Sequence, residues 1–211
     1  MGRIAGEVEP PRALLVEPAA AWGGSWPAGP KLLAAVAYHA TRVDGPILEC
    51  GSGLTTAVLA VLAAKTSRPV WTLEHLPHWG EQTQRVLGRL GCDSVVLHVV
   101  PLCNYGSFDW YDPPRDVMPN DFALVMCDGP PGRTRGGRRG LLPFPGTCLD
   151  PGYVVLLDDP ARPREACVVE AWSLRLAVPY RVYGVEKPFA VLRLPDDERC
   201  QEPFLDRWLA S

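Results

Sequence analysis

The sequence has no long apolar run and no excess of charge of either sign. Nowhere do about 18 apolar residues follow one another, as a membrane-spanning helix requires, and residues 1–10 lack the apolar stretch of a secretion signal. The net charge is -3, from 21 basic and 24 acidic residues, so no global field attracts nucleic acid or an anionic membrane. We expect a cytoplasmic protein that binds neither of them.

The sequence also lacks the usual signatures of zinc sites and disulfide frameworks. Its seven cysteines never form Cys-x-x-Cys, and its four histidines show no metal-binding spacing. Most cysteines stand beside aliphatic residues, which indicates buried free thiols. Among the histidines, His39 is expected on a helix surface, His98 inside a strand, and only His75 near the site proposed below.

The composition is that of one packed globular domain, with 211 residues of which 47% are hydrophobic and 21% charged. Glycine and proline separate apolar runs of strand length from longer runs of helical length. Helices are expected at 30–42, from the turn at 51–53 to about 65, at 78–90 and at 165–177; strands are expected at 47–50, 70–74, 94–100, 122–127 and 153–157, with a closing antiparallel hairpin at 180–185 and 189–194.

Strands that alternate with helices predict an α/β fold, a Rossmann-like three-layer sandwich with a mostly parallel sheet. Ligands of such sheets bind at the carboxyl ends of the strands, where the strand order reverses. We interpret residues 1–45 as a leader and first helix, 46–195 as the ligand-binding unit and 196–211 as a tail, all within one domain. Residues 101–120 are expected to form a long loop that belongs to the site.

A glycine turn and a later acidic residue indicate a nucleoside site. Gly51-Ser52-Gly53 joins a strand to a helix, where the backbone is accessible and the helix start offers unpaired N–H groups. Alone, this could be only a tight connection. Glu74 ends the next strand, about 20 positions further on, where a carboxylate can accept hydrogen bonds from both ribose hydroxyls. Together they favour a ribose-bearing ligand over a merely solvated carboxylate.

The residues around the turn narrow the choice of ligand. Thr56 stands where a dinucleotide site would have a third glycine, so a diphosphate is disfavoured. Hydroxyl and N–H groups at the helix start, from Ser52, Thr55 and Thr56, suit the single carboxylate of an amino acid. Glu49, just before the turn, adds negative charge suited to a cation. An amino-acid nucleoside with a sulfonium meets both requirements.

These residues resemble those of the class I Rossmann-like S-adenosylmethionine-dependent methyltransferases. Residues 47–53 look like the first motif of that family, and Leu73-Glu74-His75 looks like its ribose-binding strand end. The resemblance spans 46–194 and implies a seven-stranded sheet with S-adenosylmethionine as cofactor. It places Gly51 to Gly53 against the methionyl part, Glu74 on the ribose, and His75 with Leu102 near the adenine. Many members carry an acidic residue after strand three, which Pro101-Leu102-Cys103-Asn104 lacks.

Three carboxylates are expected at the ligand edge of neighbouring strands, Asp128 after one strand and Asp158 with Asp159 after the next. One could stabilise a sulfonium, and another could take the proton of an acceptor hydroxyl as the methyl group moves. We assign Asp128 and Asp159 to catalysis, Asp128 also to the cofactor, and Asp158 to the acceptor. One of the latter pair could instead cap the following helix.

The same strand ends resemble the metal-binding positions of catechol-type O-methyltransferases. There Mg²⁺ takes oxygen ligands and lowers the pKa of the acceptor hydroxyl. Pro160 stands where that pattern has asparagine. A divalent metal is therefore not favoured, and we assign no metal ligand.

Two further segments are candidates for binding the acceptor. Trp110 and Tyr111 could wall an acceptor pocket or simply pack their segment onto the sheet. The segment after Asp128 is rich in arginine, and we assign Arg133 to the acceptor. Arginine forks bind carboxylate or phosphate, so these side chains could bind an anionic acceptor, remain solvated, or belong to a lid that orders with substrate.

The leading hypothesis is methyl transfer from S-adenosylmethionine to a small molecule, by O-methylation. The enzyme would mainly supply proximity and alignment. Three alternatives remain open: aminopropyl transfer or cyclisation on the same cofactor, an NAD-dependent oxidoreductase, and a partner-binding scaffold without activity. The absent third glycine disfavours the oxidoreductase.

Overall fold

The computed structural model describes residues 18, 20–22, 28–114, 116–119, 121–142 and 153–193. Most of the expected leader, the tail at 196–211, Cys148 and Cys200 lie outside them. The helices are α2 (Pro30–Ala40), α3 (Leu54–Thr66), α4 (Pro77–Leu90) and α5 (Pro163–Leu176), with a 3-10 turn η1 (Gly137–Leu141); the strands are β1 (Ile47–Cys50), β2 (Val70–Glu74), β3 (Val95–Val99), β4 (Leu102–Asn104), β5 (Asp109–Tyr111), β6 (Leu124–Cys127), β7 (Val154–Asp158), β8 (Tyr180–Tyr183) and β9 (Phe189–Arg193).

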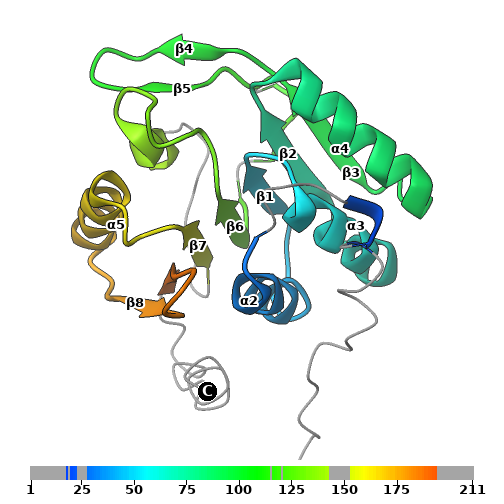
Figure 1. Ribbon diagram of the computed structural model, residues 1–211, viewed down its shortest axis with the longest axis horizontal. Helices are drawn as coiled ribbons and strands as arrows, with labels where there is room; N and C mark the ends of the chain where they lie inside the picture. Colours follow the sequence, from blue (N-terminus) through cyan, green and yellow to red (C-terminus); the bar gives the residue numbers. More distant parts are fainter. Residues whose placement is uncertain are drawn as a thin grey trace, which may run out of the picture.

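The main sheet has seven strands in the order β3-β2-β1-β6-β7-β9-β8 (Figure 1). The first five are parallel, and β9 runs antiparallel to both β7 and β8. Strand order reverses between β1 and β6, because β2 and β3 lie on one side of β1 while β6 and β7 lie on the other. The predicted Rossmann-like sheet with its closing antiparallel hairpin is confirmed.

Short, mostly apolar runs form the central strands, with Glu49 as the charged exception in β1. All four residues of β1 and all four of β6 are buried, as expected for parallel strands that are covered on both faces. The helix after β2 has clear boundary signals: Pro77 occupies its first turn, and Gly91 ends it in the left-handed conformation at φ 63°. The expected limits of this helix are therefore confirmed to within a residue.

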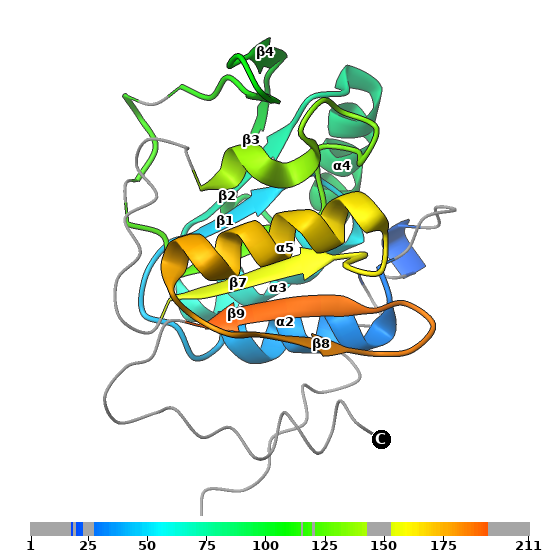
Figure 2. The same ribbon diagram turned by 90° about the vertical axis from the view of Figure 1, so that its left-hand side faces the viewer.

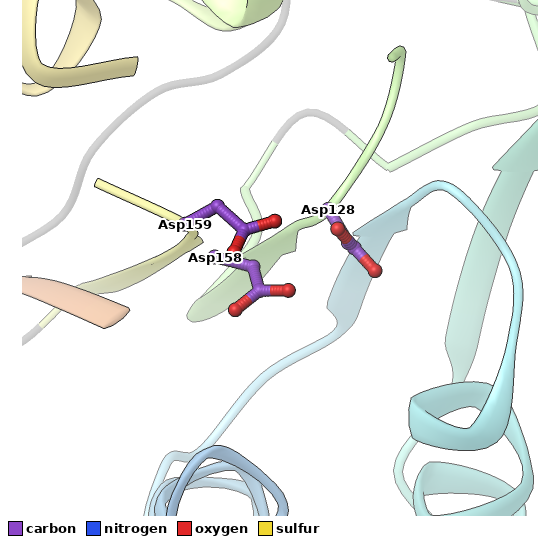
Figure 3. Close-up of side chains that lie close together, drawn as sticks. All are labelled: Asp128, Asp158 and Asp159. Carbon is purple, nitrogen blue, oxygen red and sulfur yellow. The ribbon is translucent and has the colours of Figure 1, made fainter. Parts of the chain in front are cut away.

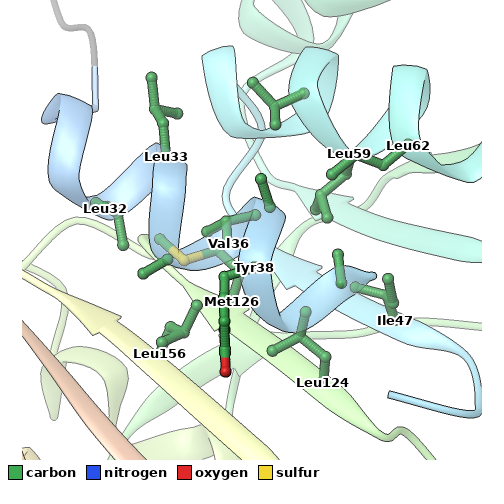
Figure 4. Packing of buried hydrophobic residues seen from close by; sticks show 14 of the residues in the cluster. Leu32, Leu33, Val36, Tyr38, Ile47, Leu59, Leu62, Leu124, Met126 and Leu156 are labelled. Atoms are coloured by element: carbon green, nitrogen blue, oxygen red, sulfur yellow. The ribbon is translucent and has the colours of Figure 1, made fainter. Parts of the chain in front are cut away.

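Two apolar clusters hold helices against opposite faces of the sheet. Figure 2 shows α5 on one face, with α2 and α3 behind the sheet on the other. In the first cluster, Leu33 and Val36 of α2 and Leu59 of α3 pack with side chains of β1, β6 and β7 (Figure 4). In the second, Trp172 of α5 and Trp110 of β5 join the opposite face of the same strands.

The segment 101–120 differs from the expected loop, because it contains an antiparallel hairpin formed by β4 and β5. Figure 1 shows this hairpin apart from the main sheet. Each strand has only three residues and mixes polar with apolar side chains. Sequence periodicity cannot detect so short a pair, since alternation needs about four residues or more to be recognised.

The expected surface position of His39 is wrong. Its residue is only 2% exposed, because α2 is buried along nearly its whole length rather than on one face. Burial, followed by the nearby charges of Arg193 and Arg42, lowers the pKa of His39 to about 3. The imidazole is therefore neutral at physiological pH.

The described cysteines are free thiols, as expected, although Cys50 and Cys127 are the only fully buried ones among them. Cys167 is exposed on α5, so the expected burial does not hold for every thiol. No helix in the described part of the chain is both long and apolar enough to cross a membrane.

A glycine substitution at position 140 tests the packing of η1 on the hairpin, and one at position 88 is its control. A Cβ at Gly140 would lie 2.5 Å from the ring of Trp110, which is 1% exposed, so Gly140→Ala should lower the free energy of unfolding by about 1 to 3 kcal/mol. Gly88, exposed on α4, has nothing within 4 Å of its Cβ position. Gly88→Ala should therefore raise that free energy by about 1 kcal/mol. Urea unfolding measures both; equal stability of Gly140→Ala and wild type would contradict the contact.

Candidate functional site

The reversal point of the sheet is closed by a contact between two glycines. Gly51, at φ 87°, follows β1, and a Cβ there would lie 2.7 Å from the amide nitrogen of Gly129. The amides of Asp128 and Gly129 donate to the Cys50 carbonyl at 2.9 and 2.6 Å. A side chain at Gly51 would break this contact, so the turn after β1 and the end of β6 meet only because both positions are glycine.

The other glycine of the turn is open. Nothing lies within 4 Å of a Cβ position at Gly53, which is partly exposed. Its amide donates to Thr56 Oγ1 at 2.8 Å. Because α3 begins at Leu54, the N–H groups of its first turn have no partner within the helix. The accessible parts of the turn are therefore main-chain groups.

The hydroxyl groups that the sequence assigned to the cofactor are engaged inside the protein. Ser52, Thr55 and Thr56 are 8%, 2% and 0% exposed. Thr55 Oγ1 donates to Glu49, and both the amide and Oγ of Ser52 donate to Glu74 at 2.9 Å. In this structure these side chains fix the shape of the turn, and direct contact with a cofactor remains a prediction.

Glu49 lies beneath the turn and is 0% exposed. One carboxylate oxygen accepts from Thr55 and the other from Thr72, the latter at 2.9 Å. Burial raises the pKa of Glu49 to about 7, helped by the negative charge of Asp128 and opposed by the threonine hydroxyls. In this structure Glu49 organises the start of α3 from inside, and its contact with a cofactor remains a prediction.

Glu74 ties the end of β2 to the turn. Its Oε2 accepts the two Ser52 hydrogen bonds, and its Oε1 accepts from the amides of His75 and Leu76 at 2.7 and 2.9 Å. His75 Nδ1 lies 3.1 Å from Oε1. Burial alone would raise the pKa of Glu74, but the hydrogen bonds from His75, Leu76 and Ser52 outweigh it and lower the pKa. The carboxylate is therefore ionised.

Helix α4 supplies two supports that sequence reasoning missed. Trp79 Nε1 donates to the carbonyl oxygen of Ser52, and Thr83 Oγ1 lies 3.0 Å from Ser52 Oγ. Trp79 and Thr83 are four residues apart, so they share one helix face directly after Glu74. That spacing was the available signal, but a polar and an aromatic residue at helical spacing occur in many amphipathic helices.

The three predicted carboxylates meet at the ends of β6 and β7. Oxygen atoms of Asp128, Asp158 and Asp159 all lie within 4.8 Å of one another (Figure 3). Burial raises the pKa of Asp158 to about 7, and the negative charges of Asp128 and Asp159 add to this effect, while Arg138 opposes it. Asp159 has a left-handed backbone, φ 57°, and pairs with Arg162 at 2.7 Å. The expected acidic cluster is confirmed.

Arg138 of η1 is the functional candidate that sequence reasoning did not single out. It is 2% exposed, and its Nη2 donates to Asp128 Oδ1 at 3.0 Å and to the Asp128 carbonyl. Its Nη1 donates to the carbonyl of Asp158 and approaches that of Cys127 at 3.5 Å. Burial would lower the pKa of Arg138, but acidic neighbours led by Asp128 raise it.

The carboxylate cluster does not fit a divalent metal well. Its oxygen atoms are ligands that Mg²⁺ prefers, but Asp128 is already paired with Arg138 and Asp159 with Arg162. Within the described residues, Asp158 is the one member without an ion pair to arginine. The chain itself therefore supplies most of the charge that a cation would bring.

The arginine-rich segment after Asp128 is packed in place. Arg135 forms an ion pair with Asp109, whose amide donates to the Arg135 carbonyl at 2.9 Å. A Cβ at Gly136 would lie 2.4 Å from Cβ of Phe108. In this structure the segment and the β4–β5 hairpin together form one wall, whereas the sequence left an anion-binding, a solvated and a lid-forming segment as alternatives.

The remaining predicted residues have different environments. Trp110 and Tyr111 are 1% and 0% exposed, so in this structure neither offers a surface to an acceptor. Tyr111 Oη has no hydrogen-bond partner among the described residues and lies against Gly129. Leu102 is half-buried against the second cluster, and Arg133 is exposed. Their contacts with cofactor or acceptor remain predictions.

The burial of Glu49 predicts that the stability of the protein depends on pH. Because its folded pKa is raised from 4.5 to about 7, its contribution to stability is full below about pH 4.5 and is lost as the pH rises through 7. Glu49→Gln removes this titration. Between about pH 5 and pH 8, the melting temperature of the variant should therefore fall less than that of wild type. Parallel pH curves for the two proteins would show that Glu49 does not titrate in this range.

Comparison with known proteins identifies the fold. No protein-family model and no curated protein matches the sequence. Among solved structures, the O-methyltransferase TomG from Streptomyces achromogenes, in complex with SAM, has a TM-score of 0.60 at 18% identity, over 87% of this chain and 90% of that one. A precorrin-6y C5,15-methyltransferase from Geobacter metallireducens gives 0.56 at 13%, over 81% and 94%. A methyltransferase from Pyrococcus furiosus gives 0.53 at 20%, over 88% and 98%. The chain has the Rossmann-like fold of class I methyltransferases.

Proposed function

We propose that this protein is an S-adenosylmethionine-dependent methyltransferase that O-methylates a small molecule. The observation that carries this proposal is the turn at residues 51–53, which leaves open space at Gly53 and is tied through Ser52 to Glu74 on the neighbouring strand. It lies where the strand order reverses, the usual ligand position in open α/β sheets. Structures of the same fold, one of them in complex with SAM, support the choice of cofactor.

The methionyl part would lie against the turn at Gly51 and Gly53 and accept hydrogen bonds from the N–H groups at the start of α3, because the amides of Gly51 and Gly53 already donate to Leu73 and Thr56. The ribose would be bound by Glu74, which already accepts four hydrogen bonds. A carboxylate has about four lone-pair positions, so ribose hydroxyls must replace some of the present donors. Exchanging one hydrogen bond for another has a small net free energy. His75 and Leu102 would border the adenine.

The sequence assigned catalysis to Asp128 and Asp159 and the acceptor to Asp158, but Asp158 is the better base for an acceptor hydroxyl. Its pKa of about 7 is suited to general base catalysis near neutral pH, whereas Asp128 and Asp159 are paired with arginines. S-adenosylmethionine, when bound, supplies a methyl group on a sulfonium. Asp158 would accept the proton of the acceptor hydroxyl while its oxygen takes the methyl group, and the carbon–sulfur bond that breaks would leave the cofactor as a neutral thioether. Asp128 and Asp159 would set the electrostatic environment, and exposed Arg133 could attract an anionic acceptor.

Binding of the product thioether tests the cofactor assignment. Titration calorimetry should detect S-adenosylhomocysteine and no heat with NAD. Glu74→Ala should weaken the affinity by about tenfold or more, since it removes charged hydrogen-bond acceptors from a buried site. Glu81→Ala, at an exposed position on α4, is the matched control and should bind as wild type does. If wild type does not bind S-adenosylhomocysteine, the proposal is overturned. The masses of the products formed from labelled cofactor distinguish methyl transfer from aminopropyl transfer or cyclisation.

The pH profile tests the base. With an acceptor found by screening, kcat/KM of wild type should rise as the pH passes through about 7, where Asp158 loses its proton. Asp158→Asn should lower kcat by about 10² to 10⁴ fold and remove this rise. The variant should also be more stable than wild type at alkaline pH, because a buried charge is gone. Asp121→Asn, exposed before β6, is the control; an unchanged profile in Asp158→Asn would assign the base elsewhere.

A further inference from the structure

The acidic strand ends contain a cation that belongs to the chain. The guanidinium of Arg138 lies between the ends of β6 and β7, where its two terminal nitrogens contact Asp128 Oδ1 and the carbonyls of Cys127, Asp128 and Asp158. The residue is 2% exposed, so water screens this charge little. A planar fork with fixed donors is suited to hold several oxygen atoms at once.

The charges of the cluster nearly balance without any added ion. Arg138 pairs with Asp128 at 3.0 Å, and Arg162 pairs with Asp159 at 2.7 Å. Of the three carboxylates in the cluster, Asp158 is then the one without an ion pair to a described arginine. A divalent cation at these oxygens would have to displace or face the guanidinium of Arg138, whose charge is buried and therefore repels another cation with little screening by water.

We propose that Arg138 is the resident cation of this site, a positioning residue that does with a tethered guanidinium what a bound divalent metal would otherwise do. It neutralises Asp128 and holds the ends of β6 and β7 at a fixed separation. It follows that the protein needs no divalent metal, and that removing this one side chain creates a demand for one. The inference concerns the site of the proposed function, but it rests on folding and metal binding rather than on methyl transfer.

Thermal unfolding in EDTA and in MgCl₂ or MnCl₂ tests this inference. Wild type should melt at the same temperature in all three. Arg138→Met should melt roughly 10 °C lower in EDTA, because the Asp128 carboxylate and the main-chain carbonyls at the ends of β6 and β7 lose their buried donor, and should recover a large part of that loss in MgCl₂ or MnCl₂. Arg139→Met, which changes the exposed neighbour on the same turn, is the matched control and should show neither effect.

Two more variants keep the test decisive if Arg138→Met does not fold. Arg138→Lys keeps the charge without the fork, so it should be moderately destabilised and insensitive to metal. The double variant Asp128→Asn with Arg138→Met removes both partners and should be more stable than Arg138→Met alone, with a weaker metal response. Metal stabilisation of wild type, or an equal metal response in Arg138→Lys and Arg138→Met, would overturn the inference. If wild type does not bind S-adenosylhomocysteine, the proposed function is overturned, but the inference about Arg138 is not.

Discussion

The site depends on the main-chain contact between Gly51 and Gly129. This contact joins the turn after β1 to the end of β6 at the point where the strand order reverses. The turn with Ser52, which is hydrogen-bonded to Glu74 and suited to a nucleoside, therefore lies next to the acidic cluster that contains Asp128. Neither side can move independently, because the Cys50 carbonyl accepts hydrogen bonds from the residues that follow β6.

Two buried carboxylates next to this contact have pKa values that are shifted in opposite directions. Glu74 accepts three main-chain N–H groups and one hydroxyl, which stabilise its ionised form. Glu49 accepts hydrogen bonds from hydroxyl groups and faces the negative charge of Asp128. Burial is therefore the dominant effect, and it raises the pKa of Glu49 to about 7. The sequence identified both residues and the hydroxyls around them, but it assigned the hydroxyls of Ser52 and Thr55 to the ligand. The direction in which a short polar side chain points depends on packing from other elements, and no local pattern contains that information.

The sheet was predictable because its central strands, such as β1 and β6, are short and mostly apolar and are followed by glycine-containing turns. The acidic cluster was predictable because parallel strands bring their carboxyl ends to one edge. The β4–β5 hairpin was not, because three-residue strands carry no periodic signal. Arg138 could not be separated from the exposed arginines beside it either. Its burial arises from long-range packing, since η1 lies against the hairpin and α5.

The interlocked wall of hairpin and η1 has a thermodynamic consequence for recognition. Phe108 lies against Gly136 and Trp110 against Gly140, so the wall loses its conformational entropy when the chain folds rather than when a ligand arrives. Such a preorganised surface selects ligands by shape, and less binding free energy is consumed by ordering the protein. It also adapts poorly to molecules of another shape, so the proposed methyl transfer would accept a narrow range of acceptors.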